Sequence, residues 1–321
     1  MISVIIVTYN SSEQIAKCLA SLESNRGSSI GEIIVVDNAS SDGTAERVRQ
    51  QFPGVKLIAA ERNLGFAAAS NLGASQASGS ALLFLNPDAE LHGPVSELER
   101  ALESAPDIVA AAPRLVDAQG QTQVGFNVRR FPHATDLIFE ILLLNRLFPN
   151  NPVNRRYRCL DFDHARPAEV EQPAGACLLV RRTSFERCGG FDERFFPLWF
   201  EDVDLCLRLR RNACGGEAKA RGRILFCPRV QVVHSGGHSL ESITFSERQV
   251  YWYRNLLYYV HKHFPWTTGF AVRAALLCGM ALRLAAELPG LLLSSPARTP
   301  TRGARVCAYW KAAKLSFQGW K

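Results

Sequence analysis

Short apolar runs alternate with helix-like segments throughout the first 112 residues, and this alternation constrains the fold more than any other feature. The runs lie at residues 2–10, 32–40, 55–60, 81–86 and 107–113, and the first of them is a continuous β-branched run. The segments between them show helical spacing, as at Ile15, Leu19 and Leu22. Because short apolar strands separated by helices typically form βαβ units, the pattern predicts a mostly parallel sheet in an α/β fold, covered by helices on both faces.

Polar side chains follow several of these expected strands. Asn10, Asp37, Asn63 and Asp88 all fall at or just after a strand end. Ligands of open α/β sheets bind at the carboxyl ends of the strands, so the sequence predicts a nucleotide-binding architecture. Neither a GxGxxG fingerprint nor a P-loop lysine motif occurs, which argues against a dinucleotide site and a Walker-type site.

The positive charge of the chain is concentrated near its C-terminus. The net charge is +7; residues 241–321 contain 11 Lys and Arg against 3 Asp and Glu, whereas residues 1–240 contain 26 against 27. Such a basic tail favours contact with an anionic surface, either a membrane or a nucleic acid. The nine cysteines lack CxxC spacing, which indicates reduced thiols and a cytoplasmic setting. The first residues show no basic leader, so no signal peptide is expected.

The rest of the chain divides into a less regular middle and a helical end. Residues 113–170 are rich in Arg, Pro and Asn and show no clear periodicity. Beyond them we expect a strand at residues 172–182, a loop entering a helix at 195–211, and one or two strands ending at His234. From about residue 245 the chain becomes helical, aromatic and basic. We therefore expect a catalytic-type domain at residues 1–244 and an amphipathic helical region at 245–321.

Seven motifs follow one another between residues 1 and 240. They are VIIVTYN, VVDNASSDGT, NLGFAAASN, LFLNPDAEL, AGACLLVRR, FFPLWFEDVDLCLRLRR and VVHSGGHS. In this order they resemble glycosyltransferase family 2, and more narrowly its rhamnosyltransferase-like bacterial branch. The resemblance implies a GT-A fold, a nucleotide-sugar donor, a divalent cation (Mg²⁺ or Mn²⁺) and an inverting reaction. It also implies a nucleotide-sugar-binding half at residues 1–112 and an acceptor-binding half at residues 113–244.

Asn86-Pro87-Asp88 follows a buried strand and is the first candidate metal site. A nucleoside diphosphate leaves readily only when its developing charge is neutralised, and a divalent cation with oxygen ligands does this. The family usually has a DxD carboxylate pair here, so the resemblance assigns Asp88 to the metal and Asn86 to the ribose or a metal-bound water. The alternative is a plain turn, since Asn-Pro-Asp suits one. His234, and less so His238, resembles a histidine that completes the metal site in several relatives; a structural histidine is the alternative.

Other polar and small residues near the strand ends are candidates for nucleotide-sugar binding. They are Thr8, Asn10, Asp37, Asn63, Gly65 and Asn71. A carboxylate at Asp37 can accept hydrogen bonds from a base or a ribose. Gly65 opens a helix rich in alanine, where the backbone can approach a ligand closely and the helix N-terminus favours an anion. For Asn71, close packing of this small-residue helix on the sheet is the alternative.

The segment FEDVDLCLRLRR places acids in the first turn of an expected helix and arginines in its last turn. This order suits the helix dipole, and Asp204 and Arg208 have i, i+4 spacing for an ion pair. The aromatic run before the acids suggests a pocket wall, where burial raises the pKa of a carboxyl group. An inverting transfer needs one base to take the proton of the acceptor hydroxyl. The resemblance assigns this role to Asp202, with Glu201 orienting the acceptor or the base.

Four further residues are candidates for binding the acceptor. Two belong to the AGACLLVRR motif, and two come directly before the acids of the predicted helix. They are Gly175, Ala176, Trp199 and Phe200. An aromatic ring can stack against the face of a sugar, although packing in the core is the alternative for Trp199 and Phe200.

Residues 266–293 are apolar over a length sufficient to span a membrane. They include Arg273, Arg283 and Glu287, which fall in one sector of a helix at 100° per residue. We therefore expect an amphipathic helix that lies in the membrane interface, preceded by a segment rich in Tyr, Trp, Lys and Arg. The alternatives are a helix pair packed on the catalytic domain or a dimer interface. Nucleic-acid binding is not expected, because the basic residues are interleaved with apolar segments.

Motifs and resemblance together imply an inverting, metal-dependent hexosyltransferase of bacterial cell-surface polysaccharide synthesis. The implied reaction moves L-rhamnose from dTDP-L-rhamnose to a polyprenyl-linked saccharide at the cytoplasmic face of the inner membrane, with a homo-oligomer also compatible. One alternative is another nucleotide sugar, such as UDP-galactofuranose or a UDP-hexose. Another is a non-catalytic nucleotide-sugar-binding protein, which the missing first carboxylate at Asn86 favours. A nucleotidyltransferase would need a Gly-rich basic loop after the first strand, and none is present.

Overall fold

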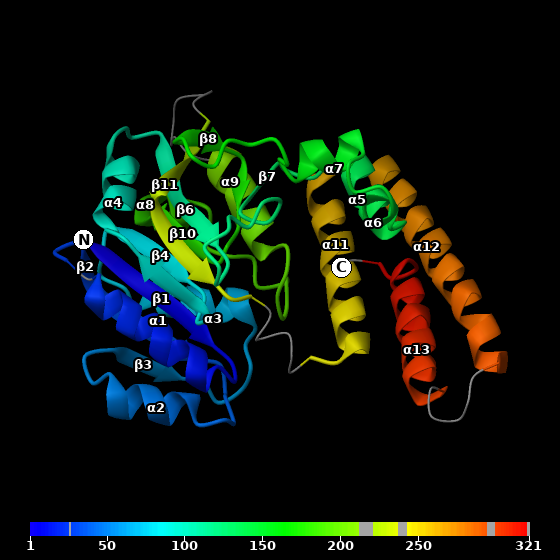
Figure 1. The fold of residues 1–321 in the computed structure, drawn as a ribbon, viewed down its shortest axis with the longest axis horizontal. Coiled ribbons are helices and arrows are strands. Elements are labelled where there is room, and N and C mark those ends of the chain that lie inside the picture. Colours follow the sequence, from blue (N-terminus) through cyan, green and yellow to red (C-terminus); the bar gives the residue numbers. More distant parts are fainter. Residues whose placement is uncertain (26, 212–220, 237–242, 294–298, 320–321) are drawn as a thin grey trace. The chain divides into compact units, whose positions relative to one another are not determined.

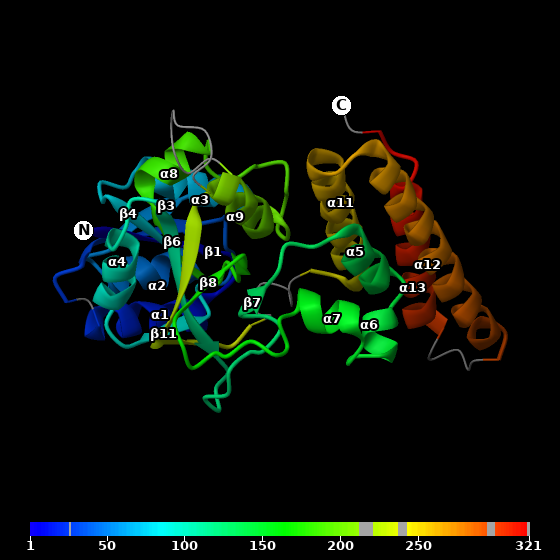
Figure 2. The same ribbon diagram turned by 90° about the horizontal axis from the view of Figure 1, so that it is seen from above.

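The structure is a computed structural model that describes residues 1–25, 27–211, 221–236, 243–293 and 299–319. The chain forms two compact units, both visible in Figures 1 and 2. Unit 1 comprises residues 1–131, 158–197 and 201–239, and unit 2 comprises residues 132–157, 198–200 and 240–321. The helical region expected at residues 245–321 lies within unit 2, and the inclusion of residues 132–157 in this unit was not anticipated.

Unit 1 is built on a mixed sheet with the strand order β3-β2-β1-β4-β10-β6-β11-β5, and β8 pairs with β11. Its strands are β1 (Ile2–Thr8), β2 (Ile30–Asp37), β3 (Lys56–Ala59), β4 (Ala81–Leu85), β5 (Ala89–His92), β6 (Ile108–Val116), β8 (Ala168–Val170), β10 (Cys177–Arg181) and β11 (Arg223–His234). Strand β1 pairs in parallel with β2 and β4, and β2 pairs in parallel with β3. Strand β10 runs antiparallel to both β4 and β6. A separate two-stranded sheet joins β7 (Val128–Arg129) and β9 (Gln172–Pro173).

Helices cover both faces of this sheet, as the alternation of runs and helices predicted. Side chains point to opposite faces along a strand, and β1 shows this directly. Ile2, Val4 and Ile6 pack in one hydrophobic core, and Ile5 and Val7 pack in the other. The first core also takes side chains from α1 (Ser12–Ser24), α2 (Thr44–Gln51) and α4 (Ser96–Glu103); the second takes them from α3 (Phe66–Ser75), α8 (Arg182–Arg187) and α9 (Glu201–Arg211). Burial on both faces explains the continuous apolar runs.

The expected strand at residues 172–182 is divided in the structure. Residues of β9 pair with β7, and β10 begins only at Cys177, where it joins the main sheet. The three residues between the two strands, Ala174, Gly175 and Ala176, form a turn at the edge of the main sheet. This turn becomes important for the candidate site.

Unit 2 is helical. It contains α5 (Ala134–Ile141), α6 (Leu144–Leu147), α7 (Pro152–Tyr157), α11 (Phe245–His263), α12 (Trp266–Leu293) and α13 (Thr299–Leu315). Thr244 starts α11 with a reciprocal capping box to Glu247. Buried residues such as Leu256, Tyr259 and Met280 form the packed side of α11 and α12. Among the described residues, one helix, Trp266–Glu287 within α12, is long and apolar enough to cross a membrane by length and composition.

The three charges of α12 lie on its packed side. Arg273 donates to the carbonyl groups of Leu315 and Ser316 at the end of α13, at 3.3 and 2.7 Å. Arg283 donates to the carbonyl of Ile141 at 2.7 Å, and Glu287 forms an ion pair with Arg305 at 2.6 Å. The single charged sector predicted from the sequence is therefore used for contacts within unit 2.

The opposite side of α12 is exposed and uncharged. We call it the apolar face, and its largest exposed members are Trp266, Phe270, Cys278 and Leu282. At 100° per residue these four residues span a sector about 160° wide. The helix thus turns its charges to the packed side together with apolar residues such as Val272, Leu276 and Met280, and it leaves a second apolar face exposed.

Candidate active site

The candidate site lies at one edge of the main sheet, where the carboxyl ends of β2, β1 and β4 meet the amino end of β10. Because β10 is antiparallel, Cys177 pairs with Leu85 at the end of β4. The backbone N–H of Asn86 then donates to the carbonyl oxygen of Ala176 at 2.9 Å. The Asn-Pro-Asp motif and the Ala-Gly-Ala turn are therefore direct neighbours, although about 90 residues separate them in the sequence.

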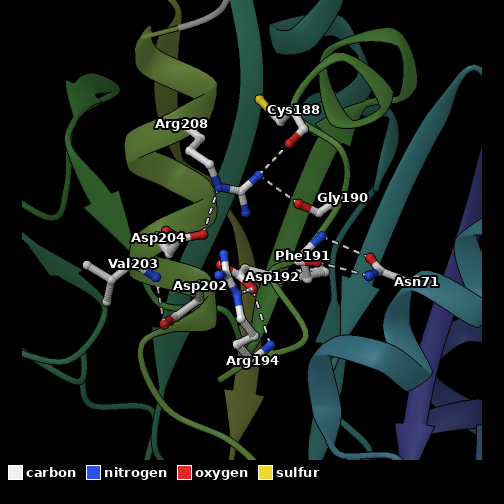
Figure 3. Close-up of polar contacts among 10 residues, drawn as sticks. All are labelled: Asn71, Cys188, Gly190, Phe191, Asp192, Arg194, Asp202, Val203, Asp204 and Arg208. Carbon is white, nitrogen blue, oxygen red and sulfur yellow. Dashed lines mark hydrogen bonds and ion pairs between the residues drawn. The ribbon is translucent and has the colours of Figure 1, made fainter. Parts of the chain in front are cut away.

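Asp202 is held against this turn from the first turn of α9. Its Oδ2 accepts the backbone N–H of Gly175 at 3.1 Å. Its Oδ1 accepts the N–H of Val203 at 2.8 Å, a bond drawn in Figure 3. Gly175 permits the contact, because a Cβ atom there would lie only 2.9 Å from the Cβ of Asp202. Asp202 and the Asp88 motif therefore share one edge of the sheet.

The surroundings of Glu201 and Asp202 favour their protonated forms. Burial raises the pKa of Asp202, while the N–H groups of Gly175 and Val203 and the positive charge of Arg129 oppose this increase. Burial raises the pKa of Glu201 well above its usual value, and the negative charge of Asp202 adds to the effect. The Oε2 atom of Glu201 is buried and has no hydrogen-bond partner among the described residues.

Asp204 has a structural role. It is fully buried, and its Oδ2 accepts a hydrogen bond from the Nε of Arg208 at 2.7 Å (Figure 3). This contact confirms the ion pair predicted from the i, i+4 spacing. The same guanidinium donates to the carbonyl groups of Cys188 and Gly190, each at 2.8 Å. The pair thus anchors the loop between α8 and α9.

Asn71 is bonded to this same loop. Its Nδ2 donates to the carbonyl of Phe191 at 2.9 Å, and its Oδ1 accepts the N–H of Phe191 (Figure 3). The same Nδ2 also donates to Glu193 at 2.9 Å. Gly190 lies so close that a Cβ there would be 2.6 Å from the Asn71 Oδ1. These bonds tie Asn71 to the loop between α8 and α9, and its role in nucleotide-sugar binding stays a prediction.

Three predicted nucleotide-binding residues come together at the ends of β1 and β2. The hydroxyl of Thr8 donates to Oδ1 of the buried Asp37 at 3.0 Å, and Oδ2 of Asp37 accepts the N–H of Ser40 at 3.1 Å. Asn10 accepts the N–H of Ser41 at 2.8 Å through its side-chain oxygen. These bonds fix the loop that follows β2 beside Asp37.

Asn63 and Gly65 shape the entry to α3. The side-chain oxygen of Asn63 accepts the N–H of Gly65 at 2.9 Å. Gly65 has a φ of +80°, and a Cβ there would lie 2.8 Å from the ring of Phe196. The N–H of Phe66 donates to the carbonyl of Pro197 at 2.7 Å. The close approach that requires glycine is therefore to the segment at 196–197, and this N–H is not available to an anion.

Asp88 and His234 converge at the end of β11. The Nε2 of His234 lies 3.5 Å from Oδ1 of Asp88, and both side chains are largely buried. Gln123 Oε1 lies 3.2 Å from the Nδ1 of His234, and burial lowers the pKa of His234, which favours the neutral imidazole that can bind a metal. Among the described residues, no group of three or more His, Cys, Asp and Glu side chains forms a metal cluster. His238 lies outside the described residues.

These two donors fit a divalent cation that completes its shell with substrate. One carboxylate oxygen and one imidazole nitrogen converge, and such cations bound to nucleotides commonly keep their other positions for phosphate oxygens and water. Asn86, the amide in place of the first carboxylate, lies next to Ala176 through its backbone.

A segment that the sequence analysis passed over lines this part of the site. The ring of Phe126 stacks on His234, with centroids 5.3 Å apart and an interplanar angle of 3°. The guanidinium carbon of Arg129 lies 5.5 Å from the centroid of the Phe126 ring. Residues 113–170 showed no periodicity, and the motif FNVRR alone gave no signal for these roles.

The four predicted acceptor residues fall in different units. Gly175 and Ala176 belong to unit 1 and form the turn at the sheet edge, whereas Trp199 and Phe200 belong to unit 2. Phe200 is buried and packs near Trp252 and Tyr259 of α11, at 6.0 and 5.5 Å between centroids. Core packing, the alternative noted above, accounts for Phe200.

Comparison with known proteins gives a consistent result. Residues 3–189 match the family described as Glycosyl transferase family 2. An N-acetylglucosaminyl-diphospho-decaprenol L-rhamnosyltransferase of Mycobacterium tuberculosis is 28% identical over 285 residues, which cover 83% of this chain and 86% of the relative. The rhamnosyltransferase WbbL of Escherichia coli is 27% identical over 251 residues, which cover 75% of this chain and 86% of the relative.

Solved structures show the same fold. The mannosyltransferase PcManGT from Pyrobaculum calidifontis, in complex with GDP-Man and Mn²⁺, has a TM-score of 0.50 and 19% identity, covering 98% of this chain and 86% of its own. GalNAc-T7 with UDP, GalNAc and Mn²⁺ has a TM-score of 0.51 and 18% identity; the match covers 73% of this chain but only 43% of GalNAc-T7. The GT-A fold expected from the sequence is thereby confirmed.

Proposed function

This chain belongs to glycosyltransferase family 2, and from that membership we propose that it moves L-rhamnose from dTDP-L-rhamnose to a saccharide acceptor with inversion. The observation that carries the proposal is the shared sheet edge of Asp88 and Asp202. Gly175 donates its N–H to Asp202, and the next residue, Ala176, accepts the N–H of Asn86. One carboxylate thus lies where a diphosphate is expected and the other where an acceptor hydroxyl is expected.

In this proposal Asp202 is the general base. It takes the proton of the acceptor hydroxyl as the oxygen bonds to the anomeric carbon, and the electron pair of the breaking C–O bond passes to the diphosphate. Burial raises the pKa of Asp202, which is the direction that makes a carboxylate a better base near neutral pH. Glu201, whose pKa is raised further, retains its proton over a wider range and orients the acceptor through a hydrogen bond.

The donor occupies the ends of β1, β2 and β4. Asp37 accepts hydrogen bonds from the nucleoside, next to Thr8 and Asn10, while Asn86 binds the ribose or a water. Asp88 and His234 hold a divalent cation, Mg²⁺ or Mn²⁺. When bound, such a cation neutralises charge that develops on the leaving diphosphate.

The identity of donor and acceptor rests on the relatives. Two of them are named as rhamnosyltransferases, and the name of one specifies a diphospho-decaprenol-linked acceptor. We therefore propose a polyprenyl-linked saccharide as the acceptor, in bacterial cell-surface polysaccharide synthesis. Another donor, UDP-galactofuranose or a UDP-hexose, is the alternative within the family. The second alternative is a non-catalytic sugar-nucleotide-binding protein, and the presence of adjacent carboxyl groups at Glu201 and Asp202 argues against it.

A nucleotide panel tests this function. Melting temperatures are measured with dTDP, UDP and their sugars, with and without Mn²⁺, because a bound ligand stabilises the folded state according to its concentration over its dissociation constant. Nucleotide release from the same sugars is then measured. We expect stabilisation and turnover with dTDP-L-rhamnose. A preference for UDP-sugars would identify the alternative donor, and silence with all of them in a folded sample would favour the non-catalytic protein.

We also propose that unit 2 attaches the protein to the cytoplasmic face of an anionic inner membrane. The apolar face of α12 carries no charge, and Trp310 and Phe317 extend exposed aromatic surface from α13. Unit 2 contains 14 Lys and Arg against 5 Asp and Glu, a balance of +9, whereas unit 1 has a balance of −2. Apolar surface beside excess positive charge suits an anionic lipid surface.

Flotation with vesicles tests this attachment. Full-length protein should float with vesicles containing anionic lipid and less with neutral ones. Phe270→Asp and Leu282→Asp should each abolish flotation, whereas Phe148→Asp, an exposed apolar residue outside α12 and α13, should not. Protein that stays soluble at low and high salt would refute the proposal. A concentration-dependent dimer broken by Leu282→Asp would show that a second copy covers the apolar face instead.

A further inference from the structure

Arg129 is a cation without a counter-ion in the candidate active site. It is half-buried on β7, its Nε donates to the carbonyl of Gly125 at 2.8 Å, and its guanidinium lies over the ring of Phe126. Among the residues that the structure describes, no carboxylate lies within 4 Å of it, and its two Nη groups have no hydrogen-bond partner. A half-buried guanidinium with free Nη donors can donate two parallel hydrogen bonds to an oxyanion.

The strand pairing joins the segment of Arg129 to the turn that holds Asp202. Arg129 pairs with Gln172 across the small sheet, and the N–H of Ala174 donates to the carbonyl of Asn127. The same register, carried one step further, sets Phe126 level with Gly175, which donates to Asp202. On this side the positive charge of Arg129 lowers the pKa of Asp202 against the effect of burial.

The other side of this segment contacts the candidate metal pair. Phe126 lies parallel to the imidazole of His234 at 5.3 Å, and His234 lies 3.5 Å from Asp88. The ring of Phe126 thus contacts both the guanidinium of Arg129 and the imidazole of His234. Through these contacts the segment of Arg129 links the turn that holds Asp202 with the candidate metal pair.

We propose that the two Nη groups of Arg129 bind a diphosphate at this site, an assignment that rests on the function proposed above. The chemistry has two sources: the diphosphate that leaves with the nucleoside, and a diphosphate that links an acceptor saccharide to its lipid. In the first case the guanidinium receives the charge that appears when the bond to the anomeric carbon breaks. In the second it positions the acceptor so that its hydroxyl reaches Asp202. A nucleoside monophosphate contains no diphosphate, so its binding should not depend on Arg129 in either case.

Binding measurements separate the two sources. Calorimetry with dTDP and dTMP is compared for the wild type, Arg129→Gln, Arg129→Lys and the control Arg130→Gln, since Arg130 is the exposed neighbour and has no assigned contact. If the diphosphate belongs to the donor, Arg129→Gln lowers the affinity for dTDP at least tenfold, while the affinity for dTMP stays within twofold of the wild-type value. Arg129→Lys keeps the positive charge but loses the two parallel Nη donors, so its affinity for dTDP should lie between those of the wild type and Arg129→Gln.

Acceptor kinetics form the second arm. If the diphosphate belongs to the acceptor, dTDP affinity is unchanged, while Arg129→Gln raises the KM of a diphosphate-linked short-chain lipid saccharide at least tenfold. The KM of the same saccharide on an alkyl chain stays constant. Either selective loss supports the proposal. Values within twofold of Arg130→Gln in both arms would overturn it, as would equal losses for dTDP and dTMP.

The binding arm of this test does not depend on transfer activity. If the wild type binds dTDP but transfers no sugar, the proposed transferase function fails, and the comparison of dTDP with dTMP still decides the role of Arg129. If no nucleotide binds, inorganic pyrophosphate is the probe. Equal affinity of the wild type and Arg129→Gln for pyrophosphate, or no affinity in either, would overturn the assignment. Melting temperatures of the variants establish that each is folded.

Discussion

Replacing Gly175 by alanine should move the proposed base without touching the donor site. The added Cβ would lie 2.9 Å from the Cβ of Asp202 and 3.2 Å from its Oδ2. Ordinary carbon contacts lie at about 3.5–4.0 Å, so Asp202 or the turn must shift by roughly 0.6–1.1 Å. The Gly175 N–H bond to Asp202, now 3.1 Å, would then exceed hydrogen-bond length.

The size of the effect follows from this displacement. A misplacement of about 1 Å in a reacting group costs on the order of 100-fold in rate. Overpacking of this kind costs about 1–3 kcal/mol of folding free energy, which leaves the fold intact at room temperature. We therefore expect Gly175→Ala to lower kcat by roughly 10- to 100-fold while the Kd of dTDP-L-rhamnose stays within twofold of the wild type.

The assay is dTDP release at saturating donor and acceptor, with donor affinity from calorimetry. Gly54→Ala is the matched control, because no atom lies within 4 Å of a Cβ at that position. The double variant Gly175→Ala/Asp202→Asn should be no slower than Asp202→Asn alone, since both changes act on the same carboxylate. The reasoning is refuted if Gly175→Ala keeps at least half the wild-type kcat, or if it loses donor affinity in proportion to turnover.

Four further predictions concern residues of α9. Asp202→Asn should reduce turnover at least ~100-fold with donor affinity nearly intact, and a variant that retains a tenth of the activity would remove Asp202 from the role of base. Because burial raises the pKa of Asp202, the acid limb of kcat against pH should lie above the ordinary aspartate value of about 3.9; a limb at or below that value would contradict the assignment. Burial also raises the pKa of Glu201, so the folded state keeps a proton that the unfolded state loses, and stability falls as pH rises above the ordinary glutamate value of about 4.3. The melting-temperature advantage of Glu201→Gln over the wild type should therefore grow from pH 5 to pH 8, and a constant difference would show that Glu201 is not buried. Finally, Arg208→Met leaves the Asp204 carboxylate buried and should cost about 3–5 kcal/mol in urea unfolding; a loss below about 1 kcal/mol would mean that solvent reaches Asp204.

Much of unit 1 could be predicted because its strands are buried on both faces. A strand such as β1 must be apolar at every position, and this leaves a run that stands out from the helical segments around it. The same clarity extends to Asp37 and Asp88, since polar residues at the ends of such runs lie at one sheet edge. The ion pair of Asp204 with Arg208 was also predictable, because i, i+4 spacing is a local property.

Other parts of the site could not be predicted because they depend on contacts between distant segments. Gly65 and Asn71 look like ligand-binding positions in the motif, yet their close neighbours are residues of the loop between α8 and α9. Arg129 and Phe126 lie in a segment with no periodicity, and only pairing with β9 brings them to Gly175. The helices α5 to α7 were hidden for a related reason: they are short and belong to unit 2, where Arg283 of α12 donates to the carbonyl of Ile141 in α5.

The reversal of strand direction at β10 explains why a site forms at this edge at all. In a fully parallel sheet the strand beside β4 would present its carboxyl end, Arg181, next to Asn86, and Gly175 would lie at the far edge. Because β10 is antiparallel, Cys177 rather than Arg181 pairs with Leu85, and the turn that precedes β10 meets the turn that follows β4. The N–H of Gly175 is then free to bind Asp202, and the carbonyl of Ala176 receives Asn86. A single antiparallel strand therefore brings a base from α9 to the edge where the parallel strands deliver Asp37 and Asp88.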